Sequence, residues 1–271
     1  MEKIKIYVIS NRVIPKKMSD NHYLLQTGSL GKPSISEECA RDDQGVHISN
    51  KNSKYAELTG LYWIWKNQKA QYIGMLQYKR RFAKEYSLSL FKRKLTFSYH
   101  ILSSSNILHY LKKYDAIVAE EKLGEKTVDY QFRTSGFSYR GEYPGIILDA
   151  VYEVIKKEFP IYYDTFRCVM SGNIINPHNM LVAKYEVFEA YCEFLFPILD
   201  KLDKYVPVGF NNVHYNRMYG WLAERLFRVF LQFNNVVYKS FPVVDIEHMT
   251  LSMKDRLNDF LKRCARKVNK K

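Results

Sequence analysis

Three consecutive cations, Lys79, Arg80 and Arg81, follow the apolar stretch YIGMLQY at residues 72–78. Such a stretch predicts a buried strand, and polar residues that follow a strand of an α/β sheet are typical of a ligand site. Fixed guanidinium groups neutralise a diphosphate and its departing charge, and arginine does so with two parallel hydrogen bonds. These cations are consistent with a diphosphate site that needs no divalent ion. Taken alone, the residue types favour a simpler alternative, in which these three cations form a solvated basic turn or the arginines pair with neighbouring acidic loops.

The common enzyme signatures are missing from the chain. It contains no GxGxxG, GxxxxGK[ST], GxSxG or HExxH motif, and its seven histidines show no metal-ligand spacing. The four cysteines are far apart in the sequence and show no CxxC pair, which indicates free thiols in a reducing compartment. We therefore expect no bound metal, no cofactor and no disulfide framework.

The overall charge is strongly positive. Lys and Arg exceed Asp and Glu by 42 to 28, which gives a net charge of +14 and predicts attraction to a polyanion. A nucleotide diphosphate, an anionic membrane face and nucleic acid all fit this charge, and so does an ordinary basic surface. Hydrophobic residues make up 46% of the chain, which favours a folded protein without long linkers. The sequence shows no signal peptide and no membrane-spanning stretch, so we expect a cytoplasmic protein.

The N-terminal third of the chain predicts the elements that position the cations. Residues 4–10 form a β-branched and aromatic run that predicts a buried first strand, and residues 13–50 read as a long polar loop. A helix is predicted to begin near Ser49 or Asn52, either of which is a suitable N-cap, and to end near residue 67. The order strand, loop, helix, strand predicts an open α/β sheet with a Rossmann-like nucleotide-binding half.

The rest of the chain alternates between strands and mostly apolar helices. Residues 111–120 predict a helix end and a strand, residues 143–170 predict two helices that meet near Pro160, and residues 180–183 predict a strand that leads into a long helix. Another helix and a short strand precede a basic amphipathic tail. We expect one domain over residues 1–250 and a C-terminal helix over residues 251–271. That helix either lies on an anionic membrane or docks on its own domain, and the pattern does not separate the two.

Four segments of the chain resemble the capsular polysaccharide synthesis family of bacterial glycosyltransferase-like proteins. They are DDQGVHISNKNSKYAELTGLYWIWKN at residues 42–67, YIGMLQYKRRF at 72–82, NMLVAKYEVFEAYCEFLFPIL at 179–199 and RMYGWLAERLF at 217–227. The matching positions are dense and occur in the family's order over nearly the whole chain. One departure is Gln77, where the family has a histidine, and another is Lys79, where it has an arginine.

The resemblance implies a GT-A-like fold and a glycosyltransferase activity. It implies transfer of a hexose, with galactofuranose as one option, from a UDP-linked or other nucleotide-diphosphate sugar. The acceptor would be a lipid-linked or oligosaccharide precursor of capsule, O-antigen or another surface glycan, at the inner face of the cell membrane. No nucleic acid partner is expected, because the chain lacks the usual nucleic-acid-binding motifs. The alternative is a non-catalytic protein of glycan assembly or a polyanion-binding protein.

The resemblance also suggests roles for individual residues. An inverting transfer needs a carboxylate that takes the proton of the acceptor hydroxyl. Asp43, Glu57 and Glu224 are the candidates, with Asp42 beside them, although Glu57 also fits a first-turn helix acid and Glu224 a salt bridge with Arg225. Candidate substrate-binding residues, with Lys79, Arg80 and Arg81 on the diphosphate, are Asn52, Thr59, Trp65, Lys66, Tyr78, Lys79, Arg80, Arg81 and Arg217. Trp63 and Trp65 cannot share one helix face, so one is expected in the core and the other against a base or sugar.

Overall fold

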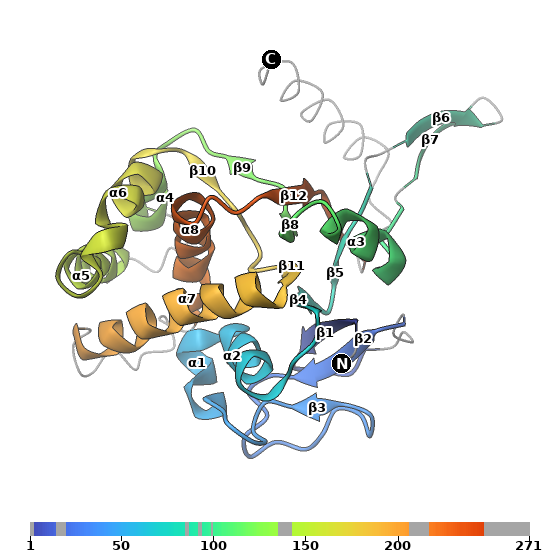
Figure 1. The fold of residues 1–271 in the computed structure, drawn as a ribbon, viewed down its shortest axis with the longest axis horizontal. Coiled ribbons are helices and arrows are strands. Elements are labelled where there is room, and N and C mark those ends of the chain that lie inside the picture. The colour runs from blue at the N-terminus through green and yellow to red at the C-terminus, as the bar shows by residue number, and fades with distance from the viewer. Residues whose placement is uncertain are drawn as a thin grey trace.

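A seven-stranded mixed sheet forms the centre of the protein, with strand order β12-β8-β11-β4-β1-β2-β3 (Figure 1). The computed structural model describes residues 3–14, 20–84, 87–91, 94–98, 100–134, 143–205 and 217–246. The strands of the central sheet are β1 (Ile4–Ser10), β2 (His22–Gln26), β3 (Ala40–Arg41), β4 (Tyr72–Gln77), β8 (Ala116–Ala119), β11 (Leu181–Lys184) and β12 (Tyr238–Phe241). Only β11 runs antiparallel to its neighbours in this sheet, which are β4 and β8.

Helices cover both faces of the sheet, and most of them lie on one face. They are α1 (Asn52–Tyr55), α2 (Leu58–Asn67), α3 (Ser104–Leu111), α4 (Val128–Thr134), α5 (Tyr143–Glu158), α6 (Tyr163–Ser171), α7 (Tyr185–Tyr205) and α8 (Met218–Phe233), with 3-10 turns η1 (Ser49–Lys51) and η2 (Pro160–Tyr162). Three small two-stranded pairs complete the fold: β5 (Arg80–Phe82) with β13 (Val243–Asp245), β6 (Ser87–Phe91) with β7 (Lys94–Ser98), and β9 (Lys122–Leu123) with β10 (Ile174–Ile175).

Strand β1 shows why the sheet is buried on both sides. Its side chains alternate between two apolar cores: Tyr7 and Ile9 pack in the core that contains α2, α7 and α8. Ile6 and Val8 pack in a smaller core with residues of α3 and β5. Because both sets are buried, the strand reads as a continuous apolar run and not as an alternating one.

The chain changes direction in the sheet at β1. It leaves β1 to form β2 on one side and later returns to form β4 on the other side, and both neighbours run parallel to β1. The connections that follow β1 and β4 therefore diverge at their carboxyl ends. In open α/β sheets a crevice at such a switch point is the usual place for a ligand.

The sheet contains one very close strand contact, between β4 and β11. A Cβ atom at Gly74 would lie 2.3 Å from the carbonyl oxygen of Leu181 and 2.6 Å from the Cα atom of Val182. No side chain fits there, so glycine is required for β11 to approach β4 this closely.

The predicted α/β class is confirmed, together with the strands near residues 4–10, 72–77, 116–119 and 181–184. The prediction of a continuous loop over residues 13–50 is wrong, because this segment contributes β2 and β3 to the sheet. The helix predicted from Ser49 or Asn52 is broken, since a 3-10 turn and α1 precede a left-handed residue, Ala56, with φ 48°. The predicted helix at residues 251–271 lies outside the described residues.

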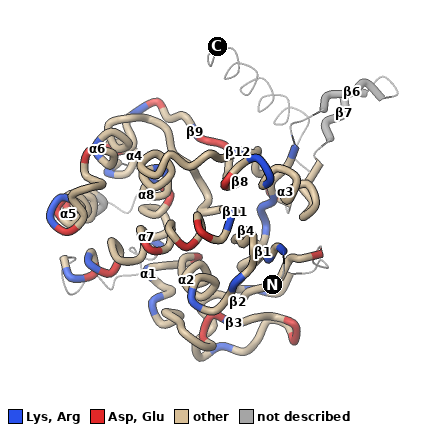
Figure 2. The backbone as a smooth tube through the Cα atoms, viewed as in Figure 1, with Lys and Arg blue, Asp and Glu red and all other residues tan. Residues whose placement is uncertain are grey.

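Charge is distributed over many elements of the described chain (Figure 2). Helices α5 and α7 carry both signs, as the pairs Lys157–Glu153 and Lys201–Glu158 illustrate. The net positive charge of the described part is therefore not gathered on one of these helices. None of the helices in the described segments has the length and apolar composition that crossing a bilayer requires.

Candidate functional site

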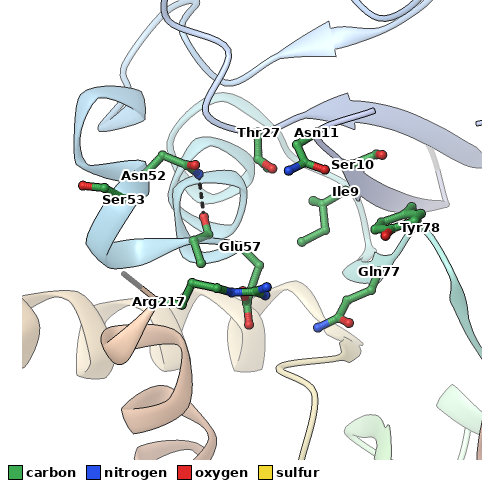
Figure 3. Close-up of a pocket in the computed structure, with 11 residues that line it drawn as sticks. Ile9, Ser10, Asn11, Thr27, Asn52, Ser53, Glu57, Gln77, Tyr78 and Arg217 are labelled. Carbon is green, nitrogen blue, oxygen red and sulfur yellow. Dashed lines mark hydrogen bonds and ion pairs between the residues drawn. The ribbon is translucent and has the colours of Figure 1, made fainter. Parts of the chain in front are cut away.

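A pocket of about 380 Å³ opens at the carboxyl ends of β1 and β4, at the switch point of the sheet (Figure 3). The first part of its wall, Ile9, Ser10 and Asn11, comes from the end of β1, and the second part, Gln77 and Tyr78, comes from the end of β4. The opposite wall comes from α1 and from the residue before α8. The described wall consists of Ile9, Ser10, Asn11, Thr27, Asn52, Ser53, Ala56, Glu57, Gln77, Tyr78 and Arg217.

Glu57 reaches the pocket because the helix is broken immediately before it. Ala56 has φ 48° and ψ −123°, so the chain leaves α1 and begins α2 in a new direction, with Glu57 at the junction. The Glu57 side chain is only 10% exposed. Its Oε1 accepts a hydrogen bond from Asn179 Nδ2 at 2.9 Å, and its Oε2 lies 3.3 Å from Arg217 Nη2. The pocket thus contains a carboxylate that is ordered but still in contact with the cavity.

Arg217 stands at the mouth of the pocket, opposite Gln77 and Tyr78 (Figure 3). Its backbone is left-handed, with φ 77°, and it occupies the position directly before α8. Its side chain is 63% exposed, so the guanidinium keeps most of its contact with solvent while it pairs with Glu57. An exposed guanidinium beside a cavity is well placed to bind a phosphate group.

Asp42 organises the wall from behind. Its buried carboxylate accepts hydrogen bonds from the backbone N–H groups of Gly28 and Ser29 and from three hydroxyl groups. The hydroxyl donors are Ser29 at 2.7 Å, Ser49 at 2.6 Å and Thr59 at 2.6 Å. Ser49 therefore holds a loop and does not cap the following helix, and Thr59 is buried behind the pocket and does not line it.

The cations after β4 lie outside the described wall. Arg81 Nη1 donates to three backbone carbonyls, those of Gln77 at 2.8 Å, Tyr78 at 3.3 Å and Arg80 at 2.9 Å. Burial lowers the pKa of Arg81 to about 10. Arg80 Nη1 donates to the side-chain oxygen of Gln77. Arg81 therefore stabilises the turn between β4 and β5, and the Arg80 side chain points to Gln77.

Lys79 also lies in this turn, where its Nζ is 5.9 Å from the centre of the Tyr78 ring. A further cation that sequence reasoning did not select, Arg12, lies over the Tyr78 ring with 4.5 Å between the guanidinium carbon and the ring centre. Arg12 follows Asn11 in the sequence and contacts Tyr78, and both of these residues line the pocket.

Glu224 and Glu57 are neighbours, but their environments differ. Glu224 Oε1 accepts from the backbone N–H of His178 at 2.7 Å, and Oε2 pairs with Arg225 at 3.1 Å. Burial raises the pKa of Glu224, and the charges of Arg225 and the His178 N–H act in the opposite direction. The predicted salt bridge with Arg225 is confirmed. Glu224 is not part of the described pocket wall.

Asp43 forms an ion pair with Arg41. Its two carboxylate oxygens accept from Arg41 Nε at 3.1 Å and from Arg41 Nη2 at 2.8 Å. Hydrogen bonding to Arg41 holds the pKa of Asp43 below its usual value. Of the three predicted catalytic acids, only Glu57 is in the described wall of the pocket.

The two tryptophans of α2 face different surroundings, as predicted. Trp63 is buried, and its Nε1 donates to the carbonyl of Gln44 at 2.7 Å. Trp65 lies on a second cavity of about 240 Å³, together with Lys66. One face of the Trp65 ring stacks on Phe196, and Lys66 Nζ lies 3.2 Å from the ring centre. Trp65 and Lys66 are thus separate from the pocket at the switch point.

The structure brings together four of the predicted site residues: Asn52, Glu57, Tyr78 and Arg217. It adds residues that the sequence did not indicate as ligands, above all Thr27 and Gln77 in the wall and Asn179 behind Glu57. Ser10 and Asn11 could have been predicted as pocket residues, because they are polar residues at the end of the first strand. Within the described segments, no three His, Cys, Asp or Glu side chains gather in a way that could hold a metal ion.

Known proteins give two comparisons. The chain is similar to the apo structure of the bifunctional glycosyltransferase WbbM, with 22% sequence identity and a TM-score of 0.77. The match covers 90% of this chain and 45% of the WbbM chain, so this protein spans less than half of that relative. This likeness concerns the fold, and it confirms the predicted GT-A-like α/β architecture. No curated protein matches the sequence. A family model described as a domain of unknown function, DUF4422, matches residues 5–235, and the chain belongs to that family.

Proposed function

We propose that this protein is a glycosyltransferase that moves a hexose from a nucleotide-diphosphate sugar to a hydroxyl group of a glycan acceptor. The observation that carries the proposal is the pairing of Glu57 and Arg217 in the pocket at the sheet's switch point. A pocket at this place in an open α/β sheet suits a nucleotide. The fold that the chain shares with WbbM supports the same reaction class.

In the proposed reaction, Glu57 acts as the general base. The hydroxyl oxygen of the acceptor forms a bond to the anomeric carbon of the sugar, and the bond between that carbon and the diphosphate oxygen breaks. The electron pair of the broken bond leaves with the diphosphate, and the hydroxyl proton passes to Glu57. Glu57 suits this role because its carboxylate is ordered by Asn179 and Arg217 and still lines the cavity.

Arg217 stabilises the departing diphosphate in this proposal. Its exposed guanidinium lies at the mouth of the pocket, and Arg12, which lies over the ring of the wall residue Tyr78, is a second cation. Lys79, Arg80 and Arg81 add positive charge behind Tyr78, although the structure directs Arg80 and Arg81 to Gln77 and to backbone carbonyls. We propose that these fixed cations neutralise the diphosphate without a divalent ion.

The substrates are proposed at the level of chemical class. We propose a UDP-linked hexose as donor, with UDP-galactofuranose as one member of the test panel, and a lipid-linked or oligosaccharide precursor of capsule, O-antigen or another surface glycan as acceptor. The reaction would take place in the cytoplasm, at the inner face of the cell membrane. These assignments extend the resemblance of the four sequence segments to capsular polysaccharide synthesis proteins.

Substitution of Glu57 tests the proposed reaction. We expect wild-type protein to bind UDP in calorimetry and to release UDP from one or more UDP-hexoses when acceptor glycan is present, with EDTA and with manganese alike. Glu57→Gln should bind UDP with similar affinity and lose about 100- to 10,000-fold in turnover, because only the proton transfer is removed. Glu153→Gln, on the exposed side of α5, is the matched control and should retain full turnover.

Three results would contradict the proposal. If wild-type protein binds no nucleotide diphosphate and no nucleotide sugar, the proposal that it is a glycosyltransferase is contradicted. UDP binding without turnover on the whole donor panel would instead favour a non-catalytic role in glycan assembly. Turnover that disappears with EDTA and returns with manganese would contradict the proposed metal-independent mechanism.

A further inference from the structure

The loop between β10 and β11 has an unusual backbone next to the pocket. His178 has φ 81° and Asn179 has φ 49°, so two consecutive residues other than glycine are left-handed. This conformation costs about 1–2 kcal/mol for an ordinary residue, and Asn and His tolerate it better than most. Residues held this way concentrate at functional sites, where the surrounding structure maintains them.

Contacts on both sides hold this loop in place. The N–H of His178 donates to Glu224 Oε1 at 2.7 Å, and its carbonyl accepts from Gln77 Nε2 at 2.8 Å. Asn176 and Met180, which flank the left-handed pair, are fully buried. The loop is therefore fixed between the end of β4 and the first half of α8.

The side chain of Asn179 has one orientation that fits its neighbours. Its Nδ2 donates to Glu57 Oε1 at 2.9 Å and to the carbonyl oxygen of Gly220 at 2.7 Å. Both partners are acceptors, so the amide nitrogen and not the oxygen must face them. The residue is only 6% exposed, and its Oδ1 has no hydrogen-bond partner within the described parts of the chain.

The first turn of α8 packs against the Glu57 carboxylate. A Cβ atom at Gly220 would lie 3.2 Å from Glu57 Oε1, so the missing side chain makes room for the carboxylate. A carboxylate beside the first turn of a helix is also favoured by the helix dipole. Oε1 is thus occupied by buried Asn179, whereas Oε2 lies toward exposed Arg217.

From this geometry we infer that Asn179 is a positioning residue, which holds Glu57 Oε1 so that Oε2 faces the acceptor hydroxyl. The inference rests on the proposed role of Glu57 as base. Asn179 itself does not line the described pocket, and its hydrogen bond to Glu57 is what connects it to a pocket residue.

Two substitutions of Asn179 test the inference. Asn179→Ala removes the hydrogen bond, and we expect turnover to fall on the order of 100-fold while the affinity for UDP stays within about twofold, since a misplaced base slows only the chemical step. Asn179→Asp places a second negative charge beside Glu57 and disfavours its ionised form. The acid limb of the pH–rate profile should therefore move to higher pH in Asn179→Asp.

The control is Asn176→Ala in the same loop. Asn176 is also buried, but its side-chain oxygen accepts from Arg228 at 3.1 Å, and no hydrogen bond joins it to Glu57. Asn176→Ala should lower the thermal unfolding midpoint and leave the pH–rate profile unchanged. The inference fails if Asn179→Asp keeps the wild-type profile, or if Asn176→Ala moves it in the same way.

A second measurement separates this inference from the proposed function. In protein labelled with ¹³C at the glutamate carboxyl groups, the resonance that Glu57→Gln removes should titrate at higher pH in Asn179→Asp than in wild type. This result needs no turnover, so it can support the positioning role even if no nucleotide sugar is a substrate. An unchanged Glu57 titration overturns the inference, whereas missing turnover in wild-type protein counts against the proposed function alone.

Discussion

Two arginines near the pocket show how the same residue type serves different purposes. Arg217 is 63% exposed, and within the described segments its ion pair is with Glu57. Arg81 is half-buried, and its Nη1 donates to three backbone carbonyls in the turn after β4. A half-buried guanidinium that satisfies carbonyls contributes to stability, whereas an exposed one beside a cavity is available for a ligand. The two residues should therefore respond oppositely to substitution.

We expect Arg217→Ala to weaken UDP binding about tenfold, the loss of one charge-assisted contact, and to change the free energy of unfolding little. Arg81→Ala should lower the free energy of unfolding by about 1–3 kcal/mol, because partly buried carbonyls lose their hydrogen bonds to a charged donor, and should weaken UDP binding less than Arg217→Ala does. Calorimetry with UDP and urea denaturation measure both quantities on each variant. A larger loss of UDP affinity in Arg81→Ala would restore the diphosphate role that the sequence suggested for it.

At the scale of elements, the loop before β11 links three parts of the site. It contacts Gln77 at the end of β4, Glu57 before α2 and Glu224 in α8. Its central His178 is buried enough that desolvation, helped by the charges of Arg80 and Lys122, lowers its pKa to about 3. The integrity of this loop should therefore depend on pH.

The sign of that dependence follows from linkage. His178 is neutral in the folded protein down to a pKa of about 3, whereas an unfolded histidine binds a proton near pH 6.5. Acidification below pH 6.5 favours the unfolded state, which binds more protons. The contribution of neutral His178 to the free energy of unfolding is therefore present above pH 6.5 and is lost as the pH falls toward 3. Between pH 7 and pH 5 the free energy of unfolding should fall by about 2 kcal/mol from this group.

His178→Asn tests this, since asparagine also accepts a left-handed backbone. Urea denaturation at pH 7 and pH 5 should show a smaller decrease in the variant than in wild type. His100→Asn, at an exposed position, is the control and should keep the full decrease. Burial also lowers the pKa of His22, so part of the wild-type decrease should remain in His178→Asn. Equal decreases in wild type and His178→Asn would contradict the assignment.

The sequence predicted those helices and strands whose apolar pattern is visible within the element itself. The apolar runs of β1, β4, β8 and β11 and the apolar side of α8 were all recognisable. Strand β2 was missed because its five residues gain strand character from pairing with β1, a contact that no local pattern reports. The break at Ala56 was missed for a similar reason, because helix propensity is satisfied on both sides of it.

Part of the candidate site could be predicted from the sequence. The resemblance suggested Asn52, Glu57, Tyr78 and Arg217, and of these Tyr78 follows a predicted strand while Asn52 and Glu57 lie near the start of a predicted helix. Asn179 was not found as a site residue, because its partner Glu57 is 122 residues away in the sequence. The cation run follows a strand that lines the pocket, but Arg81 donates to backbone carbonyls of its own turn and Arg80 donates to the side chain of Gln77.

At the scale of the whole molecule, the proposed lipid-linked acceptor would require the protein to work at a membrane surface. We propose that the basic segment 251–271 attaches the protein to an anionic membrane, because its sequence places apolar residues at helical spacing among many Lys and Arg residues. Deletion of 251–271 should reduce sedimentation with vesicles that contain phosphatidylglycerol, and the loss should shrink at high salt, where wild-type binding is also weak. Binding to neutral phosphatidylcholine vesicles is the control and should be low for both proteins. Unchanged sedimentation after the deletion would contradict the membrane role.

The central position of β11 has a consequence for biosynthesis. Strands β4 and β8 do not touch each other in the sheet, and β11 joins them from a place far along the chain. A nascent polypeptide on the ribosome therefore leaves the β11-facing edges of β4 and β8 unpaired until residues 181–184 have emerged, and the other edge of β8 unpaired until β12 follows; such edges attract other chains. A slow stretch of translation before this point would lengthen the time during which aggregation competes with completion of the sheet.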